Sequence, residues 1–381
     1  MRILYCANDP VPFPKGAGVR IEATVRALQR AGARLRLVTP RIAKPQGFAE
    51  TLEGLDHQLV EVGSGHDPFL ERAMRFRRGV EGHLRENWDV FWYRSPWEGW
   101  AGREFDGPTV FEAHGFPSME LPHHFPNLYQ HPEFLGRLAW EEQMLLHKAR
   151  LVLTVSQTGR RFLATRGTAA EKVVVVPNSA LEDAFFQGDP GEAEPLKLLY
   201  TGTLAPWQGL EQLLEALLHL KNRLPLRLRL VGTRKGRWTR PLRQLAQQLR
   251  VRSSLEFLGP FTAQELKIQL QEAHVAVAPL PADSRNMVQG CCPIKIIEFM
   301  AAGLPILSTR LPVVQELVEH DASAWLVRPN SPWALAQGLL RLAQDSQLRA
   351  RLGEGARLRA RECFHREAFD ERLAGLLRLL R

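Results

Sequence analysis

The sequence predicts an α/β protein with two Rossmann-like, doubly wound domains that face a common cleft. Three observations lead to this prediction. Short β-rich runs alternate with helix-length stretches, the alternation restarts after a polar segment, and 381 residues suffice for two cores. Strands joined by helical crossovers form parallel sheets, and ligands of such sheets bind beyond the carboxyl ends of the strands. We therefore expect the functional site in that cleft.

The first half opens with a strand at 3–6, a glycine-containing loop and a helix that stops at Gly32. A stretch at 70–78 alternates arginines with apolar residues, which predicts either a basic amphipathic helix on an anionic membrane or a solvated helix with an apolar underside. Its members are Arg72, Arg75, Arg77, Arg78, Leu70, Met74 and Phe76. Further strands are expected at 35–38, 90–93, 109–111, 151–155 and 173–176.

A polar segment rich in glycine, proline and acidic residues, 187–195, predicts a linker. We therefore expect a first domain over 1–188, a second over 189–362, and a helix over 363–381 that packs back across the domain junction. The second domain should contain strands at 196–200, 226–231, 255–258, 275–278 and 305–308 and helices at 209–224 and 294–302.

Composition excludes several classes of protein. Hydrophobic residues at 45% and charged residues at 24% are typical of soluble globular proteins. The amino-terminal residues predict a strand rather than a signal peptide, and no window approaches the ~18 apolar residues of a membrane span. We expect a cytoplasmic protein, with peripheral contact at the inner face of the cell membrane as an alternative. Four scattered cysteines predict neither a disulfide framework nor a zinc site.

The net charge of +9 suits an anionic substrate, an anionic lipid surface or a coding bias. No nucleic-acid motif accompanies it, so we expect no nucleic-acid partner.

The turn 16–18, between the first strand and the first helix, is the first candidate ligand site. Its glycines would let the backbone approach a phosphate at the helix start. Ile21 replaces the third glycine of a dinucleotide fingerprint, and Thr39 stands where its acidic residue would be. A plain tight turn and a phosphate site both remain open.

The richest pattern is the segment 290–305, GCCPIKIIEFMAAGLP. Pro293 suits a first helical turn, and the residues before it would present amides at that helix start. Glu298 could accept hydrogen bonds from a ribose diol, and Lys295 could neutralise a phosphate. A helix with a solvated Lys–Glu pair would explain the same residues.

This segment resembles the donor-binding signature of glycosyltransferase family 4, retaining enzymes with the GT-B fold, in the branch that reads sPxKxxEYMAaG. Segments along most of the chain are similar to other motifs of the family: 200–209 to vGrLxxwKG, 230–232 to LvG, 176–178 to vvPNG and 112–115 to xHg. The resemblance implies a hexosyltransferase of polysaccharide biosynthesis that needs no metal and no cofactor. Its co-substrate would be a nucleotide sugar, a UDP- or GDP-sugar, and its acceptor a glycan, a lipid-linked or a small molecule.

The resemblance also implies roles for particular residues. His114 and Lys295 would be catalytic, Glu298 would bind the ribose, the turn 16–18 would lie against the diphosphate, and the amides of 290–292 would face the donor sugar. The expected donor-binding residues are Gly16, Ala17, Gly18, Thr203, Gln208, Arg234, Lys235, Gly290, Cys291, Cys292, Pro293, Ile294 and Glu298.

Two departures from the family pattern concern the donor site, the first its diphosphate and the second a carboxylate that would bind its sugar. Thr203 and Gln208 replace the Arg and Lys that usually grip the diphosphate, and Gly290 replaces a Glu that many members carry. Because charge-assisted hydrogen bonds contribute ~1.5–3 kcal/mol each, two lost cations need a substitute. Lys295 is the first candidate, and Arg234 and Lys235 are the second.

Two rival functions share this scaffold. A nucleotide-sugar epimerase would change the sugar without an acceptor, and the run 293–298 argues against it. A non-catalytic homologue that binds a nucleotide sugar, or binds another transferase as a regulatory subunit, is the other, motivated by Thr203, Gln208 and Gly290. The loop 115–132, rich in proline, histidine and aromatic residues, is expected to shape the acceptor site.

Overall fold

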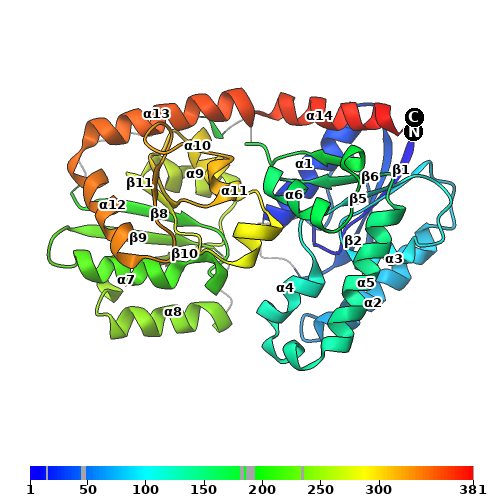
Figure 1. The fold of residues 1–381 in the computed structure, drawn as a ribbon, viewed down its shortest axis with the longest axis horizontal. Helices are drawn as coiled ribbons and strands as arrows, with labels where there is room; N and C mark the ends of the chain where they lie inside the picture. The colour runs from blue at the N-terminus through cyan, green and yellow to red at the C-terminus, as the bar shows by residue number, and fades with distance from the viewer. Residues whose placement is uncertain (14–15, 44–48, 181–183, 186–193, 233–235, 381) are drawn as a thin grey trace. The chain divides into compact units, whose positions relative to one another are not determined.

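The structure, a computed structural model, describes residues 1–13, 16–43, 49–180, 184–185, 194–232 and 236–380. The chain forms two compact units, Met1–Pro177 with Phe369–Arg381, and Asn178–Ala368 (Figure 1). The first unit ends before the expected boundary at 188, and most of the terminal helix belongs to it.

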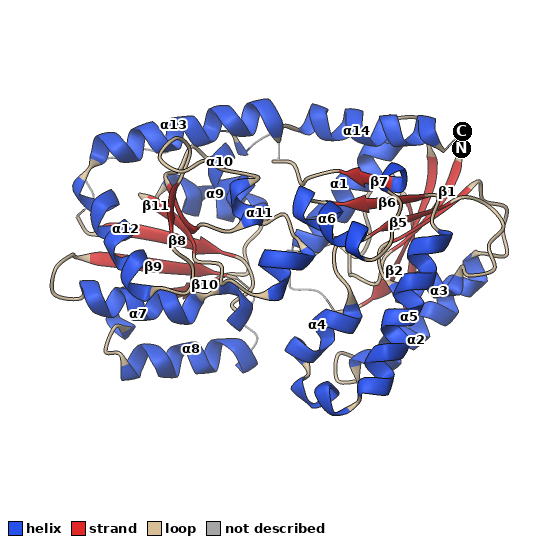
Figure 2. Cartoon of the chain, in the orientation of Figure 1, coloured by secondary structure: helices blue, strands red, loops and turns tan. Residues whose placement is uncertain are grey.

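The first unit contains a parallel sheet of seven strands in the order β3-β2-β1-β4-β5-β6-β7. Figure 2 shows its strands in red, among them β1, β2, β5, β6 and β7. Every strand expected in this half is present, and β3 was not expected. β3 lies at the sheet edge and reads DHQLVE, so it lacks the apolar run by which a buried strand is recognised. The bounds are β1 Arg2–Cys6, β2 Arg34–Arg41, β3 Asp56–Glu61, β4 Val90–Tyr93, β5 Thr109–Glu112, β6 Leu151–Thr154 and β7 Val173–Val175.

Helices cover both faces of this sheet, because successive strand residues point to opposite sides. Ile3, Tyr5 and Trp92 pack in one core with α1 and α14, whereas Leu4 and Phe91 pack in another with α2, α5 and α6. The helices of this unit are α1 Gly16–Arg30, α2 Phe69–His83, α3 Pro96–Ala101, α4 Pro117–His124, η1 Pro126–Gln130, α5 Pro132–Lys148, α6 Gln157–Thr165, η2 Ala170–Lys172 and α14 Arg366–Leu379.

The second unit contains a parallel sheet of six strands in the order β10-β9-β8-β11-β12-β13. The five strands expected here are present, and β13, with three residues, was not expected. The bounds are β8 Leu196–Thr201, β9 Leu226–Val231, β10 Leu255–Leu258, β11 Val275–Ala278, β12 Ile306–Thr309 and β13 Trp325–Val327. The prediction of an α/β fold with two doubly wound sheets is confirmed.

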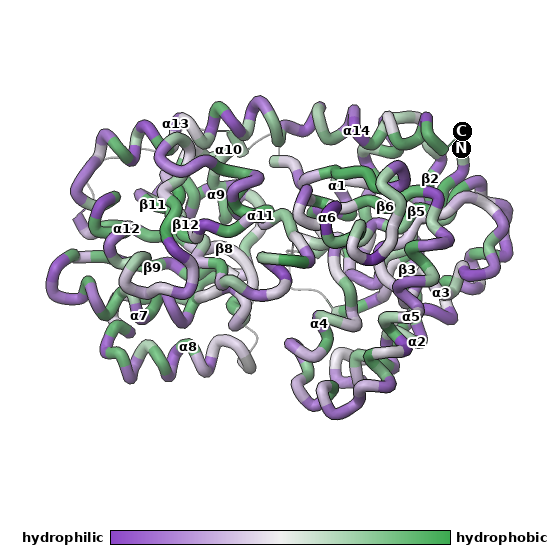
Figure 3. Tube along the Cα trace, viewed as in Figure 1, coloured by the Kyte–Doolittle hydropathy of each residue, from purple (hydrophilic) through white to green (hydrophobic). Residues whose placement is uncertain are grey.

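The helices of the second unit again alternate with its strands. α13 is the longest of those described, and hydrophilic and hydrophobic segments alternate along it (Figure 3). Its Leu352 and Ala356 are fully buried. The elements are η4 Pro206–Gln208, α7 Leu210–Leu220, α8 Gly236–Gln248, η5 Arg252–Ser254, α9 Ala263–Gln271, η6 Arg285–Gln289, α10 Ile294–Ala301, α11 Pro312–Gln315, α12 Pro332–Gln344 and α13 Ser346–Cys363.

The basic segment 70–78 lies within α2, and several of its side chains make contacts within the first unit. Phe76 is fully buried in the core, whereas Met74 is exposed. Arg75 pairs with Asp67 at 2.6 Å. Contact of this helix with an anionic membrane therefore stays a prediction. In the part of the chain that the structure describes, no helix combines the length and the apolar character needed to cross a bilayer.

Candidate functional site

A buried carboxylate, Glu112, organises the polar residues at the carboxyl end of the first sheet. Its Oε2 accepts hydrogen bonds from the Tyr5 hydroxyl at 2.6 Å and the Trp92 indole at 3.2 Å. Its Oε1 accepts from Arg20 Nε at 3.0 Å and lies 2.7 Å from His114 Nε2. Burial alone would raise the pKa of Glu112, but the neighbouring His114 and Arg20 hold that pKa well below its usual value. Glu112 is therefore ionised.

His114 follows β5 directly and is held in one orientation by Glu112. Burial, together with the Arg94 cation, lowers the pKa of His114 to about 4, so the imidazole is neutral at pH 7. An ionised carboxylate only accepts hydrogen bonds, so Nε2 carries the proton and Nδ1 has a lone pair. The site thus presents an oriented neutral imidazole whose second nitrogen can accept a hydrogen bond.

The turn 16–18 forms the start of α1. Gly18 is buried, and a Cβ there would lie 2.6 Å from the Phe13 carbonyl oxygen. Glycine at this position is therefore required by the close approach of the Phe13 backbone. Gly16 is exposed and Ala17 is partly exposed. Their contact with a diphosphate stays a prediction.

In the second unit, sheet topology brings several expected residues together. β8 pairs with β11, so the loops at their carboxyl ends are neighbours. The Lys295 ammonium donates to Gln208 Oε1 at 2.7 Å and lies 3.9 Å from the centre of the Tyr200 ring. The Tyr200 hydroxyl donates to the Thr203 carbonyl at 2.7 Å and lies 3.2 Å from Gln208 Oε1. We call Tyr200, Thr203, Gln208 and Lys295 the lysine cluster.

Gly202 leaves the lysine cluster open at one side. Its φ of 123° strains any residue with a side chain, and a Cβ there would lie 3.2 Å from Lys295 Nζ. Gly202 itself is exposed. The Lys295 ammonium has three donors, and among the described residues only Gln208 is its hydrogen-bond partner. The arrangement can present a cation to an anionic group at this edge.

Burial, modified by neighbouring charges, shifts the pKa values of Lys295 and Glu298 toward neutral pH. Burial lowers the pKa of Lys295 to about 7; the Glu298 carboxylate opposes this shift, and the Arg285 cation adds to it. Burial also raises the pKa of Glu298 to about 7, against the effect of Lys295. Among the described residues, none donates a hydrogen bond to the Glu298 carboxylate. Both groups therefore change charge near neutral pH.

A backbone hydrogen bond closes the turn before α10. The Gly290 amide donates to the Arg285 carbonyl at 2.9 Å at the end of η6, and contact of the 290–292 amides with a donor sugar stays a prediction. Gly290 is required for its φ of 87°. Asn286 anchors this turn through hydrogen bonds to Pro281 at 2.9 Å and Asp283 at 2.8 Å. Sequence reasoning missed Arg285, because its approach to Lys295 depends on this turn and not on a fixed spacing.

The remaining expected residues lie around the start of α10. Cys291 and Cys292 are buried, and the Cys292 carbonyl accepts from Asn178 Nδ2 at 2.7 Å. Pro293 is the N-cap and precedes the first helical residue, Ile294, which is partly exposed. Arg234 and Lys235 lie outside the described residues.

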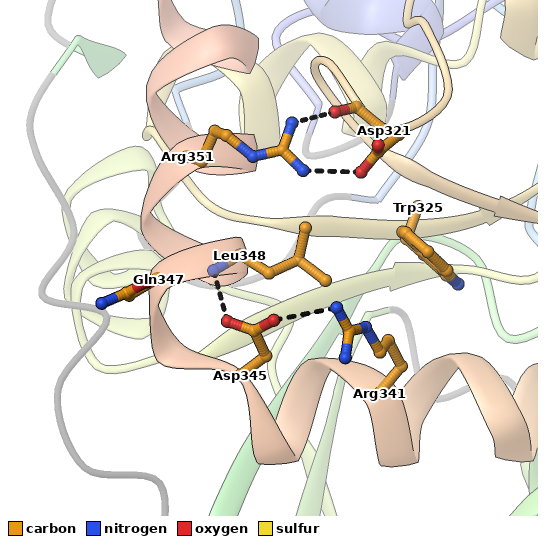
Figure 4. Close-up of a pocket in the computed structure, with 7 residues that line it drawn as sticks. All are labelled: Asp321, Trp325, Arg341, Asp345, Gln347, Leu348 and Arg351. Atoms are coloured by element: carbon orange, nitrogen blue, oxygen red, sulfur yellow. Dashed lines mark hydrogen bonds and ion pairs between the residues drawn. The ribbon is translucent and has the colours of Figure 1, made fainter.

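A separate surface depression of about 330 Å³ lies between β13, α12 and α13 (Figure 4). Its charged side chains neutralise one another: Arg351 pairs with Asp321 at 2.6 Å, and Arg341 with Asp345 at 3.0 Å. Asp345 also caps α13 through the Leu348 amide. These contacts explain the residues structurally, and none of the expected site residues lines the depression.

The titration of the lysine cluster predicts how its affinity for the nucleoside diphosphate that the family resemblance implies would depend on pH. As pH rises from 7 to 9, Lys295 loses its positive charge and Glu298 gains a negative one, so both changes disfavour an anion. We expect UDP or GDP affinity to fall by up to about tenfold per pH unit above 7. Calorimetric titration at four pH values checks this, and uridine or guanosine should show no such fall. Constant diphosphate affinity would contradict it.

Solved structures share this fold across nearly the whole chain. Sucrose-phosphate synthase of Thermosynechococcus elongatus superposes with a TM-score of 0.82 at 18% identity, covering 99% of this chain and 98% of that one. HepE of Anabaena, solved in complex with UDP-glucose, gives a TM-score of 0.75 at 21% identity and covers 99% of each chain. The fold is that of the GT-B glycosyltransferases.

Family comparisons cover both halves. Residues 14–180 match the model for Glycosyltransferase Family 4, and residues 183–359 match the model for glycosyl transferases group 1. The chain belongs to the family 4 glycosyltransferases, as the resemblance of its motifs implied.

Among the relatives, a candidate colanic acid biosynthesis glycosyltransferase of Escherichia coli, WcaL, is 30% identical over 71% of this chain and 64% of its own length. The Salmonella typhimurium protein of the same name is 30% identical over 65% of this chain and 61% of its own length. The match thus spans less than two thirds of these relatives. A D-inositol 3-phosphate glycosyltransferase of Xylanimonas cellulosilytica is 27% identical over 95% of this chain and 90% of its own length.

Proposed function

We propose that this protein transfers a hexose-type sugar from a nucleotide sugar, a UDP- or GDP-sugar, to a glycan or lipid-linked acceptor, with retention of the anomeric configuration and without a metal. The observation that carries the proposal is the lysine cluster with Arg285 beside the start of α10. A nearly buried ammonium next to a second cation is costly in a free protein. Bound phosphates would offset that cost.

Within the second unit, each residue near Lys295 has a proposed role. Lys295 and Arg285 neutralise the diphosphate in place of the basic residues that Thr203 and Gln208 replace. Gln208 holds the Lys295 ammonium in position through the 2.7 Å hydrogen bond. Glu298, which has no donor among the described residues, accepts hydrogen bonds from the ribose diol.

The proposed reaction needs stabilised phosphate charge rather than a protein nucleophile. The C1–O bond to the diphosphate breaks, a C1–O bond to the acceptor oxygen forms on the same face, and the acceptor proton passes to the leaving diphosphate oxygen. Lys295 and Arg285 stabilise the charge that develops on that oxygen. His114 accepts a hydrogen bond from a sugar or acceptor hydroxyl through Nδ1 and so fixes its orientation.

The comparisons support the substrate class. HepE is solved with UDP and with UDP-glucose, and the names of two relatives assign them to colanic acid biosynthesis and to amylovoran biosynthesis. By extension, we propose a nucleotide-sugar donor and a glycan acceptor for the present chain. The proposed place of action is the cytoplasm, at or near the inner face of the membrane that carries a lipid-linked acceptor.

Incubation of the full chain with UDP- and GDP-sugars tests the proposal. Slow release of free sugar and nucleoside diphosphate, accelerated by an acceptor, is the expected result, and the product should keep the donor's anomeric configuration. Conversion of one nucleotide sugar into another would instead indicate an epimerase. Binding without turnover would indicate a non-catalytic homologue.

A further inference from the structure

The chain passes between its two compact units twice, and one side chain contacts both passages. The first unit ends at Pro177 and resumes at Phe369. Arg20, on α1, donates from Nη1 to the Pro177 carbonyl at 2.8 Å, and its guanidinium carbon lies 4.7 Å from the centre of the Phe369 ring. We call Pro177 and Phe369 the connector residues.

The same guanidinium also contacts the Glu112–His114 pair. Arg20 Nε donates to Glu112 Oε1 at 3.0 Å, the oxygen that lies 2.7 Å from His114 Nε2. Arg20 is 3% exposed, so these contacts are made in a largely dry environment. The buried Arg20 guanidinium thus contacts both connector residues and Glu112, the residue that orients the His114 imidazole.

The ion pair with Glu112 explains a cation at position 20, but it does not explain why that cation is a full guanidinium. Among the described residues, Arg20 Nη2 is buried without a hydrogen-bond partner. A buried donor without an acceptor costs free energy, and a lysine could pair with Glu112 without bringing this additional donor into the core. The three contacts of the guanidinium, with Glu112, Pro177 and Phe369, therefore explain the arginine better.

We propose that Arg20 is a positioning residue that couples the two connector residues to the orientation of His114. Movement of either connector then shifts the guanidinium, and through Glu112 it shifts the imidazole. The consequence for catalysis depends on the function proposed above, whereas the mechanical coupling does not.

Hydrogen exchange of the full chain tests the coupling, with a control on the same two helices. Arg30 on α1 pairs with Asp370 on α14 at 2.7 and 2.8 Å, on the surface and away from Glu112. In Arg20→Met we expect peptides that cover 174–180, 364–372 and 110–116 to exchange about tenfold faster or more, because charge-assisted contacts are lost. In Arg30→Met we expect faster exchange around Asp370, within the peptide 364–372, and unchanged exchange in 174–180 and 110–116.

A second readout follows His114 directly. The groups that act on it are Glu112, Arg94 and Arg20, and the Arg20 cation contributes to lowering its pKa. Nuclear magnetic resonance titration of the His114 ring should therefore give a higher pKa in Arg20→Met and an unchanged one in Arg30→Met. If Arg20→Met does not fold, Arg20→Lys serves as the second variant. Lysine keeps the positive charge, but a single ammonium cannot donate to both Pro177 and Glu112 and also stack on the Phe369 ring. That variant should loosen both connectors and leave the His114 pKa low.

Three results would overturn the coupling. The first is faster hydrogen exchange at only one connector residue in Arg20→Met. The second is an equal increase in exchange rate throughout the first unit, and the third is the same exchange pattern in Arg20→Met and Arg30→Met. These outcomes do not depend on turnover, so they are distinct from failure of the proposed transferase activity. In a transfer assay, Arg20→Met should lower kcat more than it changes the donor KM, because Arg20 acts through His114.

Discussion

Replacing Lys295 by methionine is expected to weaken UDP or GDP binding by about 10- to 100-fold, because a charge-assisted contact contributes ~1.5–3 kcal/mol. The same variant should unfold at an equal or higher temperature. Burial holds the pKa of Lys295 at about 7, below its unfolded value, so the native state binds fewer protons than the unfolded state between pH 7 and 10.5 and the cation destabilises the fold. Calorimetric titration and thermal unfolding at pH 7 measure both effects.

Lys221→Met provides the matched control, since Lys221 is an exposed residue at the end of α7. It should change neither diphosphate affinity nor stability. Uridine and guanosine should bind the Lys295 variant as they bind the wild type. Equal losses for nucleoside and diphosphate would mean that Lys295 supports the site as a whole rather than the phosphates.

Replacing Glu112 by glutamine is expected to lower the free energy of unfolding by about 3–5 kcal/mol, because a buried charge network loses its central carboxylate and Arg20 remains buried. Four donors converge on this carboxylate at 2.6–3.2 Å, and an amide can accept through one oxygen only. Denaturation of the full chain by urea measures the change. Turnover should also fall, since His114 loses the acceptor that fixes its ring.

Glu71→Gln is the control for this loss. Glu71 pairs with Arg75 at 3.4 Å on the exposed face of α2, and such pairs contribute about 0–1 kcal/mol. A loss for Glu112→Gln no larger than for Glu71→Gln would contradict the view of Glu112 as the centre of the network.

Much of the fold could be predicted from local sequence because both sheets are buried on both faces. Runs such as 90–93 and 275–278 are apolar throughout, which is typical of such strands. β3 and β13 were missed because an edge strand or a strand of three residues carries little of this pattern. The terminal helix was expected, but its assignment to the first unit depends on Phe369 and Leu373 meeting a core formed mostly from residues before 177.

The site was predictable only where motifs carry it. The resemblance pointed to Lys295 and Gln208, and the pairing of β8 with β11 explains why they meet. The sequence indicates Glu112 only as part of the His114 motif, because its donors Tyr5 and Arg20 are about a hundred residues away in the chain. Arg285 had no motif at all. Contacts between distant segments are fixed by tertiary packing, which local spacing does not encode.

The measurement that tests the central claim most directly is proton uptake on nucleoside diphosphate binding at pH 7.5, obtained by calorimetry in two buffers of different ionisation enthalpy. With a pKa of about 7, Lys295 is mostly uncharged at this pH and must be protonated to hold a phosphate. The account predicts uptake of more than half a proton in the wild type and much less in Lys295→Met. Binding with no proton uptake, or with equal uptake in both proteins, would contradict it.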